Sequence, residues 1–231
     1  LVAGLFETED RGQHELKGMS FPISLLRVTG EGTARSRFEV VARRGLTPLV
    51  GRDLEAGFLA EGWEQAQAGA GQAVLLSGEP GIGKSRLTSE LRTQVEQQDH
   101  TAVSITFQCS PYTQNSAFYP IIERLSLVLQ FHPEDAPEHK VAKPCEALRP
   151  YRFPHAETLA FLANLLSPPV PPDSPALNLS SRRQKQKMQE ALVAWFIEEA
   201  EQRAVYAIWE DLHWADPASV ELLIHLFQLV E

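Results

Sequence analysis

The sequence predicts an α/β fold in which a parallel sheet lies between layers of helices. Three segments carry this prediction. An apolar run at residues 73–77 leads through a glycine-rich turn into a helix-like stretch at 84–98 that contains no Gly or Pro. A second run, at 101–107, alternates apolar and polar residues, and a third apolar run covers 205–209. Strands that alternate with helices are typical of parallel sheets, because each crossover between parallel strands needs a long connection.

The glycine-rich turn reads GEPGIGKS at residues 78–85 and fits the pattern G-x-x-x-x-G-K-S/T. We call it the phosphate loop. Its glycines would let backbone N–H groups approach a small anion closely, and the helix that follows adds the positive end of its dipole. Lys84 would place an ammonium on the β- and γ-phosphates of a nucleotide, and Ser85 a hydroxyl on Mg²⁺. The predicted nucleotide contacts are Gly78, Glu79, Pro80, Gly81, Ile82, Gly83, Lys84, Ser85 and Arg86.

The apolar run at residues 205–209 ends in two carboxylates, Glu210 and Asp211. A nucleotide site needs such groups opposite its phosphate loop, one for the Mg²⁺ shell and one for the attacking water. We assign Glu210 and Ser85 to Mg²⁺, and Asp211 to the water. The pair reverses the usual Asp–Glu order, so the division of roles between the two carboxylates stays open. With Lys84, the two carboxylates are the predicted catalytic residues.

Several polar residues near these motifs have both a structural and a functional interpretation. Asp216 followed by Pro217 predicts a helix start with Asp216 as its cap, and a catalytic role is the alternative. His213 lies beside Trp214, which favours packing, although a histidine there could also sense the γ-phosphate. The guanidinium of Arg86 follows the phosphate loop directly, and the alternative for it is a solvated charge.

The chain is predicted to have three parts. Residues 1–30 are predicted to be β-rich, with a short strand between the turns at Gly12 and Gly18 and a second strand after Pro22. Two strands are unstable alone in water, so this part is expected either to pack on a partner or to be disordered. A linker is predicted at residues 31–46, and the main α/β domain at 47–231.

Further helices are predicted along the main domain. Asp53 is predicted to cap a helix. The apolar face of this helix is predicted to hold Leu54, Phe58 and Leu59. The other predicted helices cover residues 116–130, 156–166 and 181–200, with Ser181 as a cap and irregular proline-containing stretches at 132–154 and 167–176. The last helix has a basic start and an acidic end, against the helix-dipole preference, so tertiary contacts or a ligand must offset its charges.

Composition limits the class of protein. The chain has 231 residues, of which 43% are hydrophobic, and a net charge of −9. This acidic balance argues against sequence-independent nucleic-acid binding as its function. Its two cysteines form no metal or disulfide motif, and no apolar stretch is long enough to span a membrane. We therefore expect a cytoplasmic protein with reduced thiols and no membrane partner. Because the chain begins at Leu1 and ends inside a helical pattern, we expect a fragment of a longer polypeptide.

Five segments resemble a known family. They read LVGRD, GEPGIGKSRL, CSPYTQNSAFYPIIERL, LNLSSRRQKQKMQEAL and EDLHWADPASVELL. Over residues 47–231 the chain resembles the ATPase module of the signal-transduction branch of the AAA-like P-loop proteins, a type often fused behind a bacterial class III adenylate/guanylate cyclase. The resemblance implies a three-layer P-loop NTPase sandwich, ATP and Mg²⁺ as ligands, and a regulatory role in cyclic-nucleotide signalling. The resemblance also implies that Glu210 and Asp211 are the acidic pair of the site and that Arg52 lies near the adenine. The phosphate and Mg²⁺ contacts that it implies are Gly78, Gly83, Lys84 and Ser85.

The N-terminal part is similar to the closing strands of such a cyclase domain, through the segment LFETEDRGQHELKGMSFPISLLRV. Residues 1–30 would then be a cyclase tail. Its partners would be an upstream cyclase domain and downstream regulatory domains in the same polypeptide. No pair of metal-binding aspartates is found within residues 1–30, so we expect no cyclase activity from this chain.

In the family fold, one more strand follows the acidic pair. It lies in the sheet between the strand at residues 73–77, before the phosphate loop, and the strand at 205–209, before the acidic pair. The chain stops before that strand, so we expect an incomplete sheet and poor stability of the chain alone. Three functional interpretations stay open. They are an ATP-hydrolysing regulatory module, a non-hydrolytic ATP-gated scaffold of a transcription regulator, and a DNA-associated initiator-type ATPase. An oligomer is compatible with each of them.

Overall fold

The computed structural model describes residues 4–32, 37–42, 45–128 and 179–230, together with Lys143, Glu146, Phe161 and Leu165. The predicted irregular stretches at 132–154 and 167–176 lie outside the described residues, except for Lys143 and Glu146. The predicted helix at 156–166 is represented there by Phe161 and Leu165, which are helical and buried. The chain forms two compact units, Leu1–Asp53 and Leu54–Glu231.

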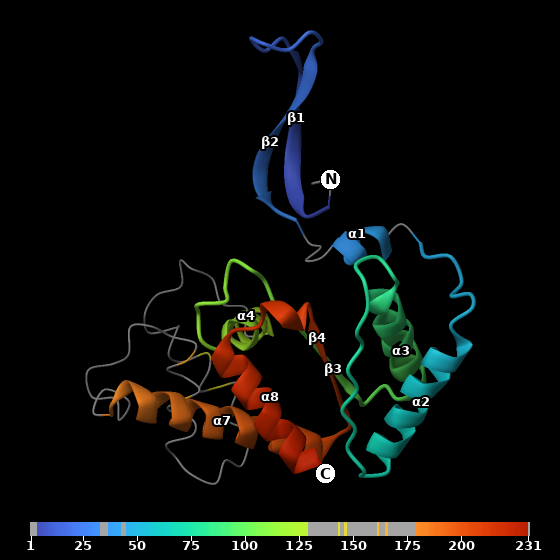
Figure 1. Ribbon diagram of the computed structural model, residues 1–231, viewed down its shortest axis with the longest axis vertical. Helices are drawn as coiled ribbons and strands as arrows, with labels where there is room; N and C mark the ends of the chain where they lie inside the picture. The colour runs from blue at the N-terminus through green and yellow to red at the C-terminus, as the bar shows by residue number, and fades with distance from the viewer. Residues whose placement is uncertain are drawn as a thin grey trace. The chain divides into compact units, whose positions relative to one another are not determined.

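The first unit contains a β-hairpin (Figure 1). Its strands, β1 (Phe6–His14) and β2 (Ile23–Glu31), pair antiparallel. The sequence predicts a short strand between Gly12 and Gly18, and this position is wrong, because β1 starts earlier and ends before Gly18. Gly12 lies inside β1, at a register shift where its φ of 79° suits glycine. The local turn signal at Gly12 is therefore a bulge within a longer strand.

The predicted linker contains a short helix, α1 (Arg37–Ala42). This helix packs against the beginning of the hairpin unit, where a Cβ added at Gly4 would come within 3.0 Å of Val40 Cγ2. Residues 37–42 of the predicted linker are thus helical and contact their own unit. The domain limits inferred from sequence stay a prediction.

The second unit combines helices with a parallel pair of strands (Figure 1). Its strands are β3 (Val103–Gln108) and β4 (Val205–Glu210). Its helices are α2 (Asp53–Gln67), α3 (Lys84–Gln98), α4 (Tyr119–Val128), α7 (Ser181–Gln202) and α8 (Pro217–Val230), and the short 3-10 helix η2 spans Leu212–Trp214. In the register of the pair, Gln108 lies opposite Glu210. The carboxyl ends of both strands therefore lie at one edge, and a mixed α/β fold with parallel strands is confirmed.

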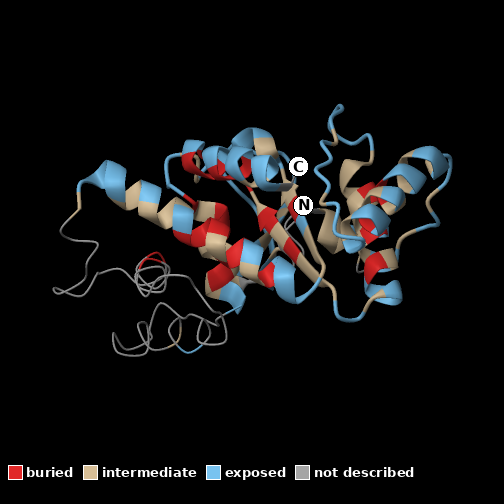
Figure 2. Ribbon diagram, turned by 90° about the horizontal axis from the view of Figure 1, so that it is seen from below, coloured by how far each residue is buried: buried red, intermediate tan, exposed pale blue. Residues whose placement is uncertain are grey.

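Helices contact both faces of the strand pair. On one face, the ring of Phe107 is fully buried, stacks on Trp209 with centroids 4.4 Å apart, and meets Phe196 of α7 edge-on. On the other face, Tyr206 meets Trp63 of α2 edge-on. Figure 2 shows buried residues gathered where the helices of this unit meet its strands. Full burial of one large apolar side chain contributes about 1.5–3 kcal/mol, so these rings anchor β3 and β4 between the helices.

The apolar run at residues 73–77 is not a strand. It has no regular structure, and Val74 and Leu75 are 44% and 76% exposed. A strand persists only where a neighbour accepts and donates its backbone hydrogen bonds, and in the described part of the chain β3 and β4 pair only with each other. The predicted buried strand is therefore wrong for this chain, because an apolar sequence alone does not supply a pairing partner.

The buried face of α2 also differs from the prediction. Leu59 and Trp63 are buried, whereas Leu54 and Phe58 are 88% and 63% exposed. Of the three predicted face residues only Leu59 is correct. The contact between Trp63 and Tyr206 selects which side of the helix turns inward, and that contact joins segments far apart in the sequence.

Two further helix predictions hold with changed limits. The sequence places the start of α4 at Ser116, but Phe118 has a φ of 58°, which a right-handed helix excludes, so α4 begins at Tyr119. Helix α7 begins at Ser181 as its first residue, and Ser180 takes the cap position without a side-chain cap bond. The predicted helical core of both segments is confirmed.

Ion pairs offset the unfavourable charge order of α7. Near its start, Lys185 Nζ lies 2.8 Å from Glu221 Oε2 of α8. Near its end, the carboxylate of Glu199 is buried and lies 2.6 Å from Arg203 Nη2. The predicted tertiary contact is therefore present at the start of the helix, through Lys185 and Glu221. The pair at its end is a local contact between residues one helical turn apart.

Candidate functional site

The phosphate loop turns sharply into α3. Gly81 and Gly83 have φ values of 82° and 105°, which strain any residue with a Cβ. No heavy atom lies within 4 Å of the position that a Cβ would take at either glycine. The loop therefore combines backbone that only glycine adopts easily with open space beside it, as close contact with a ligand requires.

Lys84 folds back over this loop. Its Nζ donates to the carbonyl oxygens of Gly78 at 2.9 Å and Glu79 at 3.0 Å. A phosphate oxygen is a stronger acceptor than either carbonyl, so the ammonium is already where an anion would recruit it. Ser85 follows in the first turn of α3, which contains no acidic side chain. Because a helix supplies no acceptors for its first N–H groups, this donor set fits a phosphorylated ligand.

The other loop residues define its outer shape. Glu79 and Pro80 are exposed, and the N–H of Ile82 donates to the carbonyl of Glu79 at 3.3 Å, which closes a turn. The guanidinium of Arg86 lies 3.8 Å from the carboxylate of Glu90, one turn further along α3. Arg86 is thus directed along the helix as a half-buried, ion-paired side chain rather than a solvated charge, and its contact with a nucleotide stays a prediction.

Glu210 and Asp211 lie at the carboxyl edge of the strand pair. Glu210 is the last residue of β4, and Asp211 follows with a φ of 53°. Gln108, at the end of β3, donates from Nε2 to Asp211 Oδ2 at 3.2 Å. Sequence reasoning missed Gln108, whose one signal is its place directly after the strand predicted at residues 101–107. The exposed carboxylate of Asp211 therefore has a defined orientation.

Asp216 caps α8, as its sequence predicts. Its Oδ1 accepts from the N–H groups of Ala218 and Ser219, both at 3.0 Å, and its Oδ2 accepts from Ser219 Oγ at 2.6 Å. The residue is 2% exposed. Its Oδ1 also accepts from the N–H of Phe118 at 3.0 Å, a contact across the chain that no sequence pattern indicates. The structural interpretation of Asp216 is confirmed, with this additional bond.

Residues 48–231 match the family described as AAA ATPase domain. The chain belongs to this family. The matched region contains the phosphate loop, the strand pair and the acidic pair, so the P-loop α/β class is that of the family. AAA ATPase domains generally bind ATP and Mg²⁺, and the hydrogen-bond donors of the phosphate loop fit the phosphates of ATP.

A curated relative, an uncharacterized protein of Rhizobium meliloti (strain 1021), is 34% identical over 115 residues. The match covers 50% of this chain and 11% of the relative. This AAA ATPase domain therefore spans a small part of the length of the relative that it matches. No solved structure matches the chain significantly.

Tyr206 connects the phosphate-loop helix of the AAA ATPase domain to the strand that carries the acidic pair. From β4, its hydroxyl donates to the carbonyl oxygen of Thr88 in α3 at 3.2 Å. Its ring meets Trp63 of α2 with centroids 6.3 Å apart. Burial raises the pKa of the Tyr206 phenol to about 12, with Glu210 adding in the same direction and Arg92 opposing. Sequence reasoning treated Tyr206 only as part of an apolar strand.

The raised pKa of Tyr206 predicts an alkaline loss of stability. In the unfolded chain the phenol ionises near its ordinary value of 10.0, whereas in the folded protein it keeps its proton to about 12. The stabilisation is therefore complete below pH 10.0 and is lost as the pH rises through about 12. Two pKa units correspond to up to about 3 kcal/mol of unfolding free energy.

Urea unfolding at several pH values between 8 and 12 measures this effect. Tyr206→Phe is expected to show a shallower alkaline decline than the unmodified protein, because it has no phenol to ionise. Tyr112→Phe is the matched control, since Tyr112 is 95% exposed and its removal is expected to leave the slope unchanged. Equal slopes for all three proteins would contradict the prediction.

Two further properties bear on the site. The rings of His213 and Trp214 lie 4.8 Å apart and both residues are exposed, so both interpretations of this histidine stay open. Within the described residues, no three His, Cys, Asp or Glu side chains gather as a metal site. Mg²⁺ bound with ATP needs only one or two protein ligands, because phosphates and waters supply the rest.

No helix in the described ranges has the length and apolar character needed to cross a bilayer.

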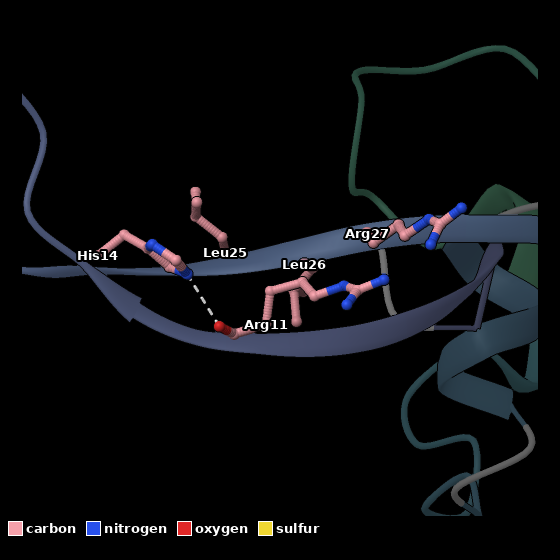
Figure 3. Close-up of a pocket in the computed structure, with 5 residues that line it drawn as sticks. All are labelled: Arg11, His14, Leu25, Leu26 and Arg27. Carbon is pink, nitrogen blue, oxygen red and sulfur yellow. Dashed lines mark hydrogen bonds between the residues drawn. The ribbon is translucent and has the colours of Figure 1, made fainter.

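The hairpin of the first unit has a shallow pocket lined by Arg11, His14, Leu25, Leu26 and Arg27 (Figure 3). The ring of His14 bonds the carbonyl oxygen of Arg11 at 2.9 Å, and the Arg11 guanidinium lies 3.0 Å from Glu9. None of the lining residues is buried. The pocket therefore has no enclosed polar group that would select a ligand.

Proposed function

We propose that this AAA ATPase domain binds and hydrolyses ATP as a regulatory module of a larger signalling protein. One observation carries the proposal. Lys84 lies over a glycine loop with open space beside it, at the start of a helix whose first turn has no acidic residue. A triphosphate is the ligand that this arrangement of donors suits best, because its charge is high and its oxygens are close together.

The phosphate loop would hold the triphosphate through backbone N–H groups, with Lys84 neutralising the β- and γ-phosphates. Its proposed contact residues are Gly78, Glu79, Pro80, Gly81, Ile82, Gly83, Lys84, Ser85 and Arg86. Ser85 and Glu210 would hold Mg²⁺, which supplies charge neutralisation on the phosphates when bound. Asp211 would orient the attacking water by accepting its hydrogen bond.

The proposed reaction is in-line hydrolysis at the γ-phosphorus. The oxygen of water forms a bond to phosphorus as the bond to the β–γ bridging oxygen breaks, which releases ADP and inorganic phosphate. The proton that the water loses passes to the phosphate or, through the Asp211 carboxylate, to solvent. Asp211 is exposed to solvent and held by the Gln108 amide, so its second oxygen stays available to a water molecule. Because the acidic pair has the reverse of the usual Asp–Glu order, the opposite assignment stays open, with Asp211 on Mg²⁺ and Glu210 on the water.

Cyclic-nucleotide signalling in the cytoplasm is the proposed setting. The similarity of residues 1–30 to the closing strands of a cyclase domain supports it. Every residue of β1 is exposed, and a hairpin alone is only marginally stable, so the hairpin suits a place against further sheet in the whole protein. An upstream cyclase domain and downstream regulatory domains are the proposed partners, and hydrolysis would change their contacts with this module.

A multiple-turnover phosphate-release assay on the full-length protein tests the proposal. With Mg²⁺ and excess ATP, we expect many phosphates per chain, and loss of release when the metal is chelated. The second candidate is a non-hydrolytic scaffold, which the reversed acidic pair favours. A scaffold would bind ATP but release at most about one phosphate per chain, and that outcome would replace the first proposal. Salt-dependent DNA binding would instead favour an initiator-type ATPase.

A further inference from the structure

Two strained residues lie at the edge of the sheet that carries the acidic pair. Among the described residues, Phe118 and Asp211 are the non-glycine positions with positive φ, at 58° and 53°. Asp211 follows β4 directly, and Phe118 closes the loop that follows β3. Side chains rarely adopt this backbone region, so such strain persists only where surrounding contacts hold it, and it is commonly found at functional sites.

Each strained residue is held by a side chain from the opposite segment. Gln108, before the loop at residues 109–118, donates to the carboxylate of Asp211 at 3.2 Å. Asp216, beyond β4, accepts from the N–H of Phe118 at 3.0 Å. Between these two bonds, the N–H of Cys109 donates to the carbonyl of Glu210 at 3.1 Å. The loop at 109–118 is therefore bound at both ends to the segment that carries the acidic pair.

The loop between these two attachments is internally ordered. Successive turns are closed by the N–H of Thr113 on the carbonyl of Ser110 at 3.1 Å, and by the N–H of Ser116 on that of Thr113 at 2.9 Å. The N–H of Tyr119 then donates to Ser116 at 3.2 Å. A loop stiffened in this way transmits a displacement at one attachment to the other.

The bond from Phe118 goes beyond what a helix cap needs. A cap satisfies N–H groups in the first turn of its own helix, and Asp216 does so with Ala218 and Ser219. The additional donor comes from Phe118, 98 residues earlier in the chain. Both Asp216 and Phe118 are 2% exposed, so no water competes for this bond, and losing it would leave a buried N–H unpaired.

We propose that the loop at residues 109–118 positions Asp211 for hydrolysis, and that Asp216 is a positioning residue in this arrangement as well as a cap. Asp216 holds the far end of the loop through Phe118, and Gln108 transmits the position of the near end to the Asp211 carboxylate. This inference rests on the proposed ATPase function. It adds two residues, Asp216 and Gln108, that act through Asp211 without touching ATP.

Asp216→Ser in the full-length protein separates the two roles of Asp216. Serine is a good helix cap, but its hydroxyl is too short to serve both α8 and Phe118. We expect kcat to fall about tenfold while KM and ATP affinity stay within about twofold, because the phosphate loop is untouched. Gln108→Ala removes the hydrogen bond to the Asp211 carboxylate and changes a side chain that is partly exposed. It is also expected to lower kcat. Asp99→Ser is the matched control, because the Asp99 carboxylate also accepts a hydrogen bond from a backbone N–H, that of Thr101 at 2.8 Å. Asp99 lies at the opposite end of α3 from the phosphate loop, so its replacement is expected to leave kcat unchanged.

A double-mutant cycle distinguishes positioning from general destabilisation. In an Asp211→Asn background, Asp216→Ser and Gln108→Ala are expected to cause no further loss of kcat, because both act through Asp211. Equal losses of kcat in both backgrounds would overturn the inference, as would unchanged kcat in the single variants. If the unmodified protein shows no turnover, the proposed ATPase function fails first; turnover that is insensitive to Asp216 and Gln108 defeats only this inference.

Discussion

Replacing Lys84 by alanine is expected to weaken ATP binding about 10- to 100-fold, because a charge-assisted hydrogen bond contributes about 1.5–3 kcal/mol. In the structure the Lys84 ammonium bonds to the carbonyls of Gly78 and Glu79 on an exposed loop. Its removal should therefore change affinity far more than stability. Isothermal titration of ATP with Mg²⁺ measures the affinity, and thermal unfolding without nucleotide measures the stability.

Arg92→Ala provides the control for loss of one positive charge on the same helix. Arg92 lies two turns beyond the phosphate loop, where its guanidinium is 3.9 Å from Glu96. Its removal is expected to leave ATP affinity unchanged, because an exposed ion pair contributes little and is screened by salt. Unchanged affinity in Lys84→Ala as well would rule out the phosphate loop as the ATP site.

Replacing Asp211 by asparagine is expected to slow hydrolysis about 10²- to 10⁴-fold, the range that a positioned acid–base group supplies. Asparagine adopts positive φ more readily than most residues, so the backbone at 53° should persist. ATP affinity is expected to stay near that of the unmodified protein, because Asp211 is assigned to the water. Single-turnover phosphate release separates this chemical effect from binding.

Glu210→Gln is the matched comparison, because it removes the neighbouring carboxylate with a similar change of shape. Its expected effect is weaker Mg²⁺ dependence, measured as a higher metal concentration for half-maximal release. If Glu210→Gln instead stops hydrolysis with metal dependence intact, and Asp211→Asn alters the metal requirement, the two carboxylates have exchanged roles. If neither variant affects either readout, the acidic pair takes no part in the reaction.

Local patterns predicted several elements around the candidate site well. The helix after the phosphate loop begins at Lys84 and ends at Gln98, as its spacing predicts. The strand before the acidic pair and the cap at Asp216 are also present. Each of these features depends on a few neighbouring residues, through apolar periodicity, glycine conformation or a capping side chain, so the chain carries that information within one short segment.

Other features depended on residues far apart in the chain. The run at 73–77 has the composition of a strand but pairs with no strand among the described residues. The inward side of α2 is chosen by Trp63 meeting Tyr206. No local pattern indicates which donor reaches Asp211 or Phe118, because each of those bonds spans about a hundred residues.

The sequence by itself determined that this chain has a phosphate loop, a following helix and an acidic pair at the end of a strand. Short-range sterics and hydrogen bonding are sufficient for these features. The tertiary structure alone decided that Gln108 orients Asp211 and that Asp216 holds the loop at residues 109–118. Those contacts exist only after the parallel pairing of β3 and β4 brings the two strand ends to one edge, because strand pairing is a non-local choice.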